Sequence, residues 1–505
     1  MKQMRTDRGQ TEQKQTGRNR IGSLGKRLAS LLAALFLLTG TAPAVSFASG
    51  SPSVSAEAVV LADLDSGLVL YEKNMNVRRS PASLTKIMTG LLAVEAVENG
   101  EVSLDDVITA PADCWTGMDL DSSNAEILPG EKMTFKDYLY CALVKSANEA
   151  CNVIAAAIDG DIQAFVNRMN LRANELGATG TYFSDTNGLS SSNHYTTAHD
   201  LFLITREAMK HEIFVEAVNT IDYEIEETNM HAKRYLNSSN ALLCQDGAYG
   251  DGYLYLPASG VKTGYTKAAG YCLVSTASKN DMNLCAVVLG CGGVLNTGED
   301  GYGNFSATVS LYEWAFSNCE KRTLVEKGTV VNRAPVTYAL DNATAELRAS
   351  GELEAVLPKG YDGSRITTSI LLRNDSLTAP VSAGSVLGTL SVYLDGSLYG
   401  EIDLYTSEEV AADRKKILLH TVSELMENPR IRIPVIISAV LIVLILFLLG
   451  RYSVEKQRHY REIVEAEDRR RTERARQEAA EESLLAQQRM REARKNAELP
   501  DEDSP

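Results

Sequence analysis

Two kinds of hydrophobic pattern alternate along the first two-thirds of this chain, and together they predict strands at both ends of a run of helices. Apolar stretches bounded by turn residues indicate strands, and stretches with an apolar position every three to four residues indicate helices. The expected strands are 58–63, 67–71, 270–275 and 283–289, and the expected helices include 135–158 and 162–176. We therefore predict an α+β layer architecture for residues 56–319.

The pattern changes after this region. Residues 321–408 contain short alternating segments, such as 337–340 and 389–394, separated by Gly, Asn and Asp. Alternation of apolar and polar positions over such short lengths is typical of strands with one exposed face. We therefore predict a small all-β domain at 321–408.

A single long apolar run follows the β domain. Residues 433–449 are apolar apart from Pro434 and Ser438. The run is just long enough to cross a bilayer, and the polar tail after it offers no apolar surface that would bury it. We predict a transmembrane helix at 433–450 and a charged helical tail at 451–505, rich in Glu, Arg, Gln and Ala.

The N-terminus has the pattern of an export signal. Several Lys and Arg residues precede an apolar run at 28–38, and small residues at 42–44 and 46–48 resemble cleavage sites. This predicts a signal peptide within 1–48. An uncleaved anchor is the less favoured alternative, because a span needs about 20 apolar residues. Export would place the globular domains outside the cell membrane and the tail in the cytoplasm.

Composition excludes some classes of partner. The net charge of −16 argues against nucleic acid, which is bound by clustered Lys and Arg. The eight cysteines contain no CxxC pair and the six histidines are scattered, so we expect no metal and no cofactor. We interpret the cysteines as small buried residues, with disulfides as the alternative if the region is exported.

The segment from Ser80 to Thr89 contains the first candidate chemistry. Pro81 suits a first helical residue and Ser80 an N-cap, which would put Ser83 in the first turn of a helix. A backbone N–H there has no intrahelical acceptor and is free to bind a developing oxyanion. Lys86 follows one turn later on the same face. If it is buried and neutral, its amine can accept the Ser83 proton.

Two further segments make a chance match improbable. Ser146 and Asn148 lie in a Ser-Ala-Asn triplet, in which both side chains can reach Lys86 and a leaving group. Lys262-Thr263-Gly264 precedes the strand expected from residue 270. In this triplet Lys262 offers a charge and Thr263 a hydroxyl to a substrate carboxylate, and Gly264 allows close approach of a substrate backbone.

These elements, in this order, resemble the S-x-x-K, S-D-N and K-T-G motifs of the penicillin-recognising serine enzymes. Residues 165–177 and 187–200 add resemblance to the D-alanyl-D-alanine carboxypeptidases of the serine S11 peptidase type, over about 56–319. Residues 379–388 are similar to that family's C-terminal β domain. The resemblance implies a penicillin-binding, β-lactamase-like transpeptidase fold followed by the small all-β domain.

The resemblance also implies roles for individual residues. Ser83 would be the nucleophile and Lys86 the general base, and Ser146 and Asn148 would complete the proton network. Lys262 and Thr263 would bind the terminal carboxylate, and the backbone N–H groups of Ser83 and Tyr265 would form the oxyanion hole beside Gly264. The implied partners are a peptidoglycan pentapeptide ending in D-Ala-D-Ala, β-lactams as covalent inhibitors, and the membrane; the partner of the tail is unknown.

Some positions depart from the family pattern or stay outside it. Ala147 replaces a usual glycine, and Asn283 stands where many relatives carry a cation that would help to hold the substrate carboxylate. We expect Asn283→Arg to raise the efficiency of D-Ala release about tenfold if this residue faces the carboxylate. His194 is interpreted as a structural histidine. The family's usual anchor is an amphipathic helix on the membrane surface, whereas a spanning helix is expected here.

Two other functions fit the same motifs. A β-lactamase shares the fold, but nothing in the sequence resembles the acidic deacylation motif of that class, and an added β domain and membrane span are unexpected. A membrane-bound sensor of β-lactams or muropeptides would also be acylated, and it would signal through the span to the tail. We favour the carboxypeptidase because the three motifs occur together.

Overall fold

The computed structural model describes residues 52–496 apart from 120, 190–192, 245–251, 293–301 and 375. The expected signal peptide lies outside the described residues. The chain divides into two compact units, and each is described by itself. The second unit consists of Val336–Ala343, Thr378–Pro380 and the chain from Val410 onward, and the first contains the other described residues.

A five-stranded antiparallel sheet organises the first unit. Its strands, in spatial order, are β2 (Val69–Lys73), β1 (Ala58–Asp63), β9 (Met282–Cys291), β8 (Gly270–Lys279) and β7 (Ala258–Thr266). All six residues of β1 are buried, because helices cover both faces of the sheet. β7 is an edge strand of this sheet.

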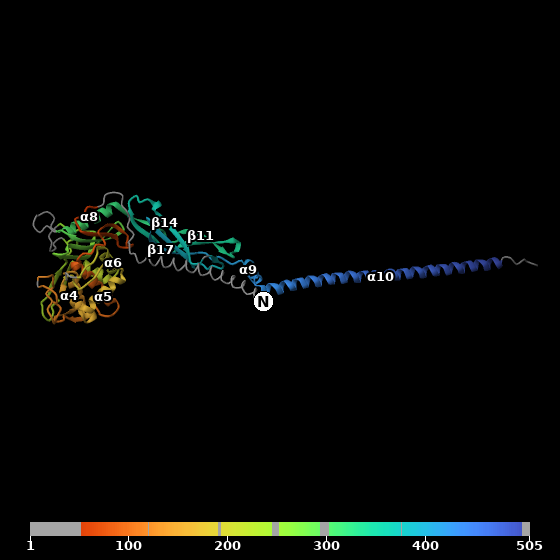
Figure 1. The fold of residues 1–505 in the computed structure, drawn as a ribbon, viewed down its shortest axis with the longest axis horizontal. Helices are drawn as coiled ribbons and strands as arrows, with labels where there is room; N and C mark the ends of the chain where they lie inside the picture. Colours follow the sequence, from red (N-terminus) through yellow and green to blue (C-terminus); the bar gives the residue numbers. More distant parts are fainter. Residues whose placement is uncertain are drawn as a thin grey trace, which may run out of the picture. The chain divides into compact units, whose positions relative to one another are not determined.

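The helices form two layers around this sheet (Figure 1). Six helices pack into one apolar core: α2 (Lys86–Glu98), α3 (Phe135–Leu143), α4 (Asn148–Asp159), α5 (Ile162–Glu175), α6 (Ala198–Ala208) and α7 (Glu212–Asn219). α8 (Gly303–Asn318) covers the opposite face through a separate core that includes Leu311 and Tyr312. This arrangement confirms the expected α+β layers. Two short hairpins, β3 (Val107–Thr109) with β4 (Lys132–Thr134) and β5 (Asp222–Ile225) with β6 (Arg234–Asn237), extend the helical side.

The helix expected at 135–158 is two helices. α3 ends at Leu143 and α4 begins at Asn148, with Ser146 between them at a φ of 66°. A left-handed φ at a non-glycine residue cannot continue a right-handed helix. The break falls on the Ser-Ala-Asn triplet, so that Ser146 lies in the turn between the helices and Asn148 is the first residue of α4.

The small β domain follows α8 directly. Its six-stranded sheet has the order β14 (Ile366–Leu372), β16 (Val386–Leu394), β17 (Ser397–Tyr405), β12 (Thr344–Ala349), β11 (Val330–Thr337) and β15 (Leu377–Thr378). β10 (Cys319–Val325) pairs with β13 (Leu353–Pro358) in a separate ladder. Short 3-10 turns lie at Leu340–Asn342 (η2) and Gly363–Arg365 (η3). The all-β prediction for this region is confirmed.

Two helices follow the β domain in the second unit. α9 (Arg414–Glu427) is short, and α10 (Pro429–Asn496) continues for 68 residues through the apolar run and the charged tail. The most apolar window of α10 has a mean hydropathy of 3.1. By length and composition, α10 can therefore cross a membrane, as the apolar run predicted.

Candidate active site

Ser83 lies in a tight turn rather than in an α-helix. The 3-10 turn η1 (Ala82–Thr85) carries it, and α2 starts only at Lys86. Ala82 has a φ of 48°, in the left-handed region, and Pro81 instead of Ser80 caps the turn. The expected Ser80 cap is therefore wrong, because a left-handed Ala82 cannot belong to a helix that starts at Pro81. The turn still places Lys86 next to Ser83.

The Lys86 ammonium group is the centre of a hydrogen-bond network. Its Nζ lies 2.9 Å from Ser83 Oγ, 2.7 Å from Asn148 Oδ1 and 2.9 Å from the Asn187 carbonyl oxygen, and donates to all three. The side chain is fully buried. The structure thus brings Ser83, Lys86 and Asn148 together although they are up to 65 residues apart in sequence. Ser146 is buried and lines the same cleft.

The Lys-Thr-Gly triplet lies inside a strand, not before one as the sequence suggested. Lys262, Thr263 and Gly264 belong to the edge strand β7, and Tyr265 follows them. A Cβ on Gly264 would lie 3.3 Å from the Ser83 backbone nitrogen and 3.2 Å from the Pro81 carbonyl oxygen. Glycine suits this position because β7 packs directly against the Ser83 turn and a side chain would crowd it, a different reason from the substrate contact that the sequence suggested.

Burial lowers the pKa of both active-site lysines. Loss of solvation is the largest cause for Lys86, and neighbouring groups such as Cys151 and Asp185 oppose it in part. The pKa of Lys262 is lowered further, by burial and by repulsion from Lys86. Two positive charges this close in an apolar setting are unfavourable. The pair therefore favours a state with one neutral amine, which can serve as a base.

These residues open onto a cleft of about 300 Å³. Ser83, Ser146, Asn148, Thr263, Gly264 and Tyr265 line it. Lys262 belongs to β7 but does not line the cleft: 1% of its surface is exposed, and its Nζ donates to the Thr263 carbonyl oxygen at 3.2 Å. Tyr265, which also lines the cleft, is half-exposed, and the centroid of its ring lies 4.5 Å from that of Tyr271.

Asn283 does not face this cleft, so the expectation for it is wrong. It pairs with Ser278 at the end of β8 opposite to the end that pairs with Thr263–Thr266. Its Nδ2 donates to the Asp65 carboxylate at 3.0 Å, on the turn between β1 and β2. The strand register thus holds Asn283 at the far end of the sheet, and we now expect Asn283→Arg to leave D-Ala release unchanged.

Two contributors to the site were missed from the sequence. The Ser239 hydroxyl lies 2.7 Å from Thr263 Oγ1 and lines the cleft, but its loop carries no motif. Asn187 contributes only its backbone carbonyl oxygen to Lys86, which no side-chain pattern reveals. Gly188 was a usable signal, since a Cβ there would lie 1.8 Å from the Ala82 carbonyl oxygen. The loop can reach the nucleophile turn only with glycine at this position.

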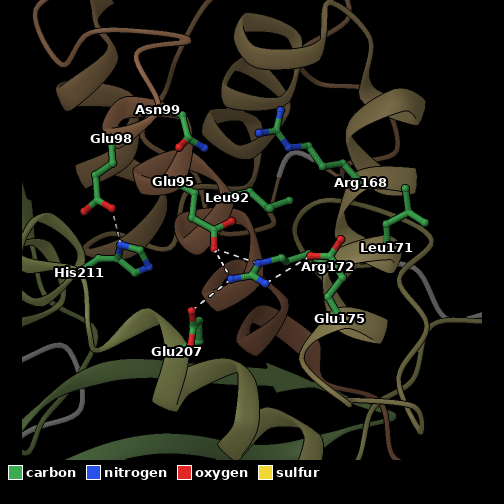
Figure 2. Close-up of a pocket in the computed structure, with 10 residues that line it drawn as sticks. All are labelled: Leu92, Glu95, Glu98, Asn99, Arg168, Leu171, Arg172, Glu175, Glu207 and His211. Carbon is green, nitrogen blue, oxygen red and sulfur yellow. Dashed lines mark hydrogen bonds and ion pairs between the residues drawn. The ribbon is translucent and has the colours of Figure 1, made fainter. Parts of the chain in front are cut away.

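A larger hollow of about 530 Å³ lies among α2, α5 and α6 (Figure 2). Ligand atoms of Glu95, Glu207 and His211 lie within 4.8 Å of one another there, as a metal site would require. However, Arg172 Nη2 lies between the two carboxylates, 2.6 Å from Glu95 and 3.2 Å from Glu207. A cation would have to displace this guanidinium. The cluster is therefore explained as an ion-pair network that joins three helices.

Seven of the eight cysteines, all except the partly exposed Cys244, are buried free thiols. Burial raises the pKa of the Cys151 thiol, which lies near Lys86 and Lys262, to about 12. It is therefore a neutral thiol that acts as a packing group next to the lysines.

Comparison with known proteins agrees with this geometry. Residues 45–293 match the D-alanyl-D-alanine carboxypeptidase family, and residues 320–412 match the C-terminal domain of penicillin-binding protein 5. D-alanyl-D-alanine carboxypeptidase DacF of Bacillus subtilis is 31% identical over 387 residues, which cover 76% of this chain and 94% of that relative. The chain belongs to the D-alanyl-D-alanine carboxypeptidase family.

Other relatives of this carboxypeptidase share both globular domains. DacC of Escherichia coli is 31% identical over 77% of this chain and 92% of its own length. The crystal structure of penicillin-binding protein 5 from Haemophilus influenzae aligns with a TM-score of 0.58 and 27% identity, and covers 72% of this chain and 99% of that one. The activity of the family is D-alanyl-D-alanine carboxypeptidation, and penicillin binding is typical of it.

Proposed function

We propose that this carboxypeptidase releases the terminal D-alanine of peptidoglycan stem peptides through a covalent Ser83 ester. The observation that carries the proposal is the 2.9 Å contact between the buried Lys86 Nζ and Ser83 Oγ. A neutral amine at that distance can take the hydroxyl proton as the oxygen attacks. Near the cleft, the described residues offer no histidine or carboxylate at hydrogen-bond distance from Ser83 Oγ that would serve instead.

The reaction proceeds in two balanced steps. Ser83 Oγ attacks the carbonyl carbon of the penultimate D-Ala and its proton passes to Lys86, while the backbone N–H groups of Ser83 and Tyr265 stabilise the oxyanion. The C–N bond then breaks, and the departing D-Ala amine receives a proton from the Lys86 network through Ser146. In the second step water attacks the ester carbonyl carbon and gives a proton to Lys86; the bond between this carbon and Ser83 Oγ breaks, Oγ takes the proton back from Lys86, and the shortened peptide leaves as a carboxylate. Asn148 orients both Lys86 and the substrate amide.

The substrate carboxylate sets the charges of the two lysines. It would sit against Thr263 and Ser239, whose hydroxyls are 2.7 Å apart, close to the buried Lys262 that precedes Thr263 in β7. A bound anion raises the pKa of Lys262 and keeps it positive. Repulsion from a positive Lys262 then favours neutral Lys86, the form that acts as the base. Substrate binding thus prepares the nucleophile.

Mass spectrometry of a D-Ala-D-Ala pentapeptide tests this function. After incubation with the purified protein, we expect a tetrapeptide product and one equivalent of free D-alanine. A peptide ending in L-Ala serves as the control and should remain intact. An unchanged D-Ala-D-Ala peptide, or release of the D-Ala-D-Ala dipeptide, would contradict the proposal.

We also propose an orientation in the membrane, with both globular domains outside the cell and the tail after α10's apolar part in the cytoplasm. The substrate lies outside the membrane, and the N-terminal pattern indicates export. Arg430 and Arg432 precede the apolar run and Arg451 follows it, so flanking charge alone does not set the direction.

Protease treatment of cells checks this orientation. Protease added to intact protoplasts should digest the catalytic domain, while an epitope fused after Pro505 stays protected until the cells are lysed. A cytoplasmic marker protein controls for leakage. Digestion of the epitope before lysis would show the opposite orientation.

A further inference from the structure

A buried hydrogen-bond chain links His194 to the residue that precedes the nucleophile. His194 Nε2 lies 2.8 Å from Thr85 Oγ1, and Thr85 Oγ1 donates to the Ala82 carbonyl oxygen at 2.9 Å. The His194 side chain is fully buried. Neither His194 nor Thr85 lines the cleft, so neither touches a substrate. The chain ends on the backbone of the turn that carries Ser83.

The contacts of His194 Nδ1 show which groups in this hydrogen-bond chain donate and which accept. The Ser184 backbone N–H donates to His194 Nδ1 at 3.0 Å, so this nitrogen is the acceptor. Burial lowers the pKa of His194, and the nearby Asp185 carboxylate opposes this only in part. A neutral ring carries one N–H, which must then be on Nε2. His194 therefore donates to Thr85, and the Thr85 hydroxyl donates to Ala82.

The turn that receives these bonds is strained. Ala82 has a φ of 48°, and a left-handed backbone is unfavourable for alanine because its Cβ crowds the following carbonyl oxygen. Such a conformation persists only where its surroundings hold it. The loop at Gly188 packs onto the Ala82 carbonyl oxygen from outside, and Thr85 holds the same oxygen from within η1. Both contacts fix the peptide that joins Ala82 to Ser83.

We propose that His194 and Thr85 are positioning residues that orient the Ser83 backbone N–H and hydroxyl for acylation. Rotation of the Ala82–Ser83 peptide would move the N–H out of the oxyanion site and Oγ away from Lys86. Small displacements of reacting groups can cost about a hundredfold in rate. The effect should fall on the acylation rate constant rather than on binding, because neither residue lines the cleft.

A neighbouring threonine gives a matched control for packing. Thr89 lies one turn further along α2, is also fully buried, and its hydroxyl donates to the Thr186 carbonyl oxygen. It contacts the same loop region as the His194 chain but not the Ala82 peptide. Thr89→Val therefore removes a buried hydroxyl of the same kind but no hydrogen bond to the Ala82 peptide.

The test is pre-steady-state acylation of the full-length protein by fluorescent penicillin, which separates the acylation rate constant from the binding constant. We expect Thr85→Val and His194→Asn to lower the rate constant about 10- to 100-fold. The Asn amide can replace only the Nδ1 acceptor, whereas Gln can place an N–H near the Nε2 position. His194→Gln, Thr85→Ser and Thr89→Val should stay within about threefold of the wild type.

A double variant tests whether the two residues act as one chain. Because both act on the same peptide, Thr85→Val with His194→Asn should be no slower than the slower single variant, within about threefold. Thermal unfolding confirms that each variant is folded. If Thr85→Val does not fold, the comparison of His194→Asn with His194→Gln decides the question by itself.

Three results would overturn the inference. The first is a wild-type acylation rate constant in folded His194→Asn, and the second is an equal loss of rate in Thr85→Val and Thr89→Val. The third is a loss in the double variant equal to the product of the losses in the two single variants. The inference rests on the proposed Ser83 nucleophile, and Ser83→Ala separates the two. Labelling that survives in Ser83→Ala rejects the nucleophile itself. Labelling lost in Ser83→Ala but unaffected by the His194 and Thr85 variants rejects the positioning role alone.

Discussion

Replacement of Ser83 by alanine should abolish covalent labelling by penicillin and reduce D-Ala release by at least about 10³-fold. The hydroxyl is the only atom of this side chain that can form the acyl-enzyme ester, and Lys86 Nζ lies 2.9 Å from it. Alanine is smaller and fits the η1 turn, so the fold should be kept. Labelling is measured by intact-protein mass spectrometry, which reports one added penicillin per chain.

Asn283→Arg is the control for this experiment. Its side chain lies at the far end of the sheet, bonded to Asp65, and both labelling and D-Ala release should equal those of the wild type. Penicillin that still adds to Ser83→Ala, located on another residue by peptide mapping, would mean that Ser83 is not the nucleophile.

Replacement of Lys86 by methionine should have the second large effect, a loss of acylation rate of about 10³-fold or more. Methionine keeps much of the apolar stem but has no amine to accept the Ser83 proton. It also leaves Asn148 Oδ1 and the Asn187 carbonyl oxygen without their donor. The measurement is the rate of labelling by fluorescent penicillin. Lys279→Met, at the exposed end of β8, should label at the wild-type rate.

The pH dependence of wild-type activity tests whether Lys86 acts as a neutral amine. The neutral amine is the active form, so kcat/KM falls as the pH drops and Lys86 becomes protonated. Burial lowers the pKa of Lys86, so this loss should occur below pH 10.5, the region for an ordinary lysine. Lys86→Met should abolish this dependence along with the rate. If the residual kcat/KM of Lys86→Met still falls at low pH as in the wild type, another group is responsible for the dependence.

Local patterns in the sequence were sufficient for several elements. Residues 58–63 and 283–289 form strands because continuous apolar runs bounded by turns suit a sheet that is covered on both faces. The apolar run at 433–449 and the polar tail predicted the helix α10 by length and composition alone. The spacing of Ser83 and Lys86 placed them together, since residues three apart share a face in either a 3-10 or an α-helical turn.

Other features were decided only by the tertiary structure. Ala82 and Ser146 have left-handed backbones, which neither residue type favours. For Ala82, the packing of Gly188 and β7 around η1 holds this conformation. Lys262-Thr263-Gly264 pairs as an edge strand through contacts with β8 that no local pattern encodes. The place of Asn283 depended on the register of β9, and a strand register is set by partners far away in sequence.

The same division applies to the chemistry. The sequence by itself determined which side chains were present in the order Ser-Lys, Ser-Asn and Lys-Thr-Gly, and hence the class of reaction. Only the folded chain buries Lys86 and Lys262 together, and that burial lowers both pKa values. Desolvation depends on every group packed around the amine, from helices and strands across the whole domain, so the basicity of this lysine pair is a property of the tertiary structure.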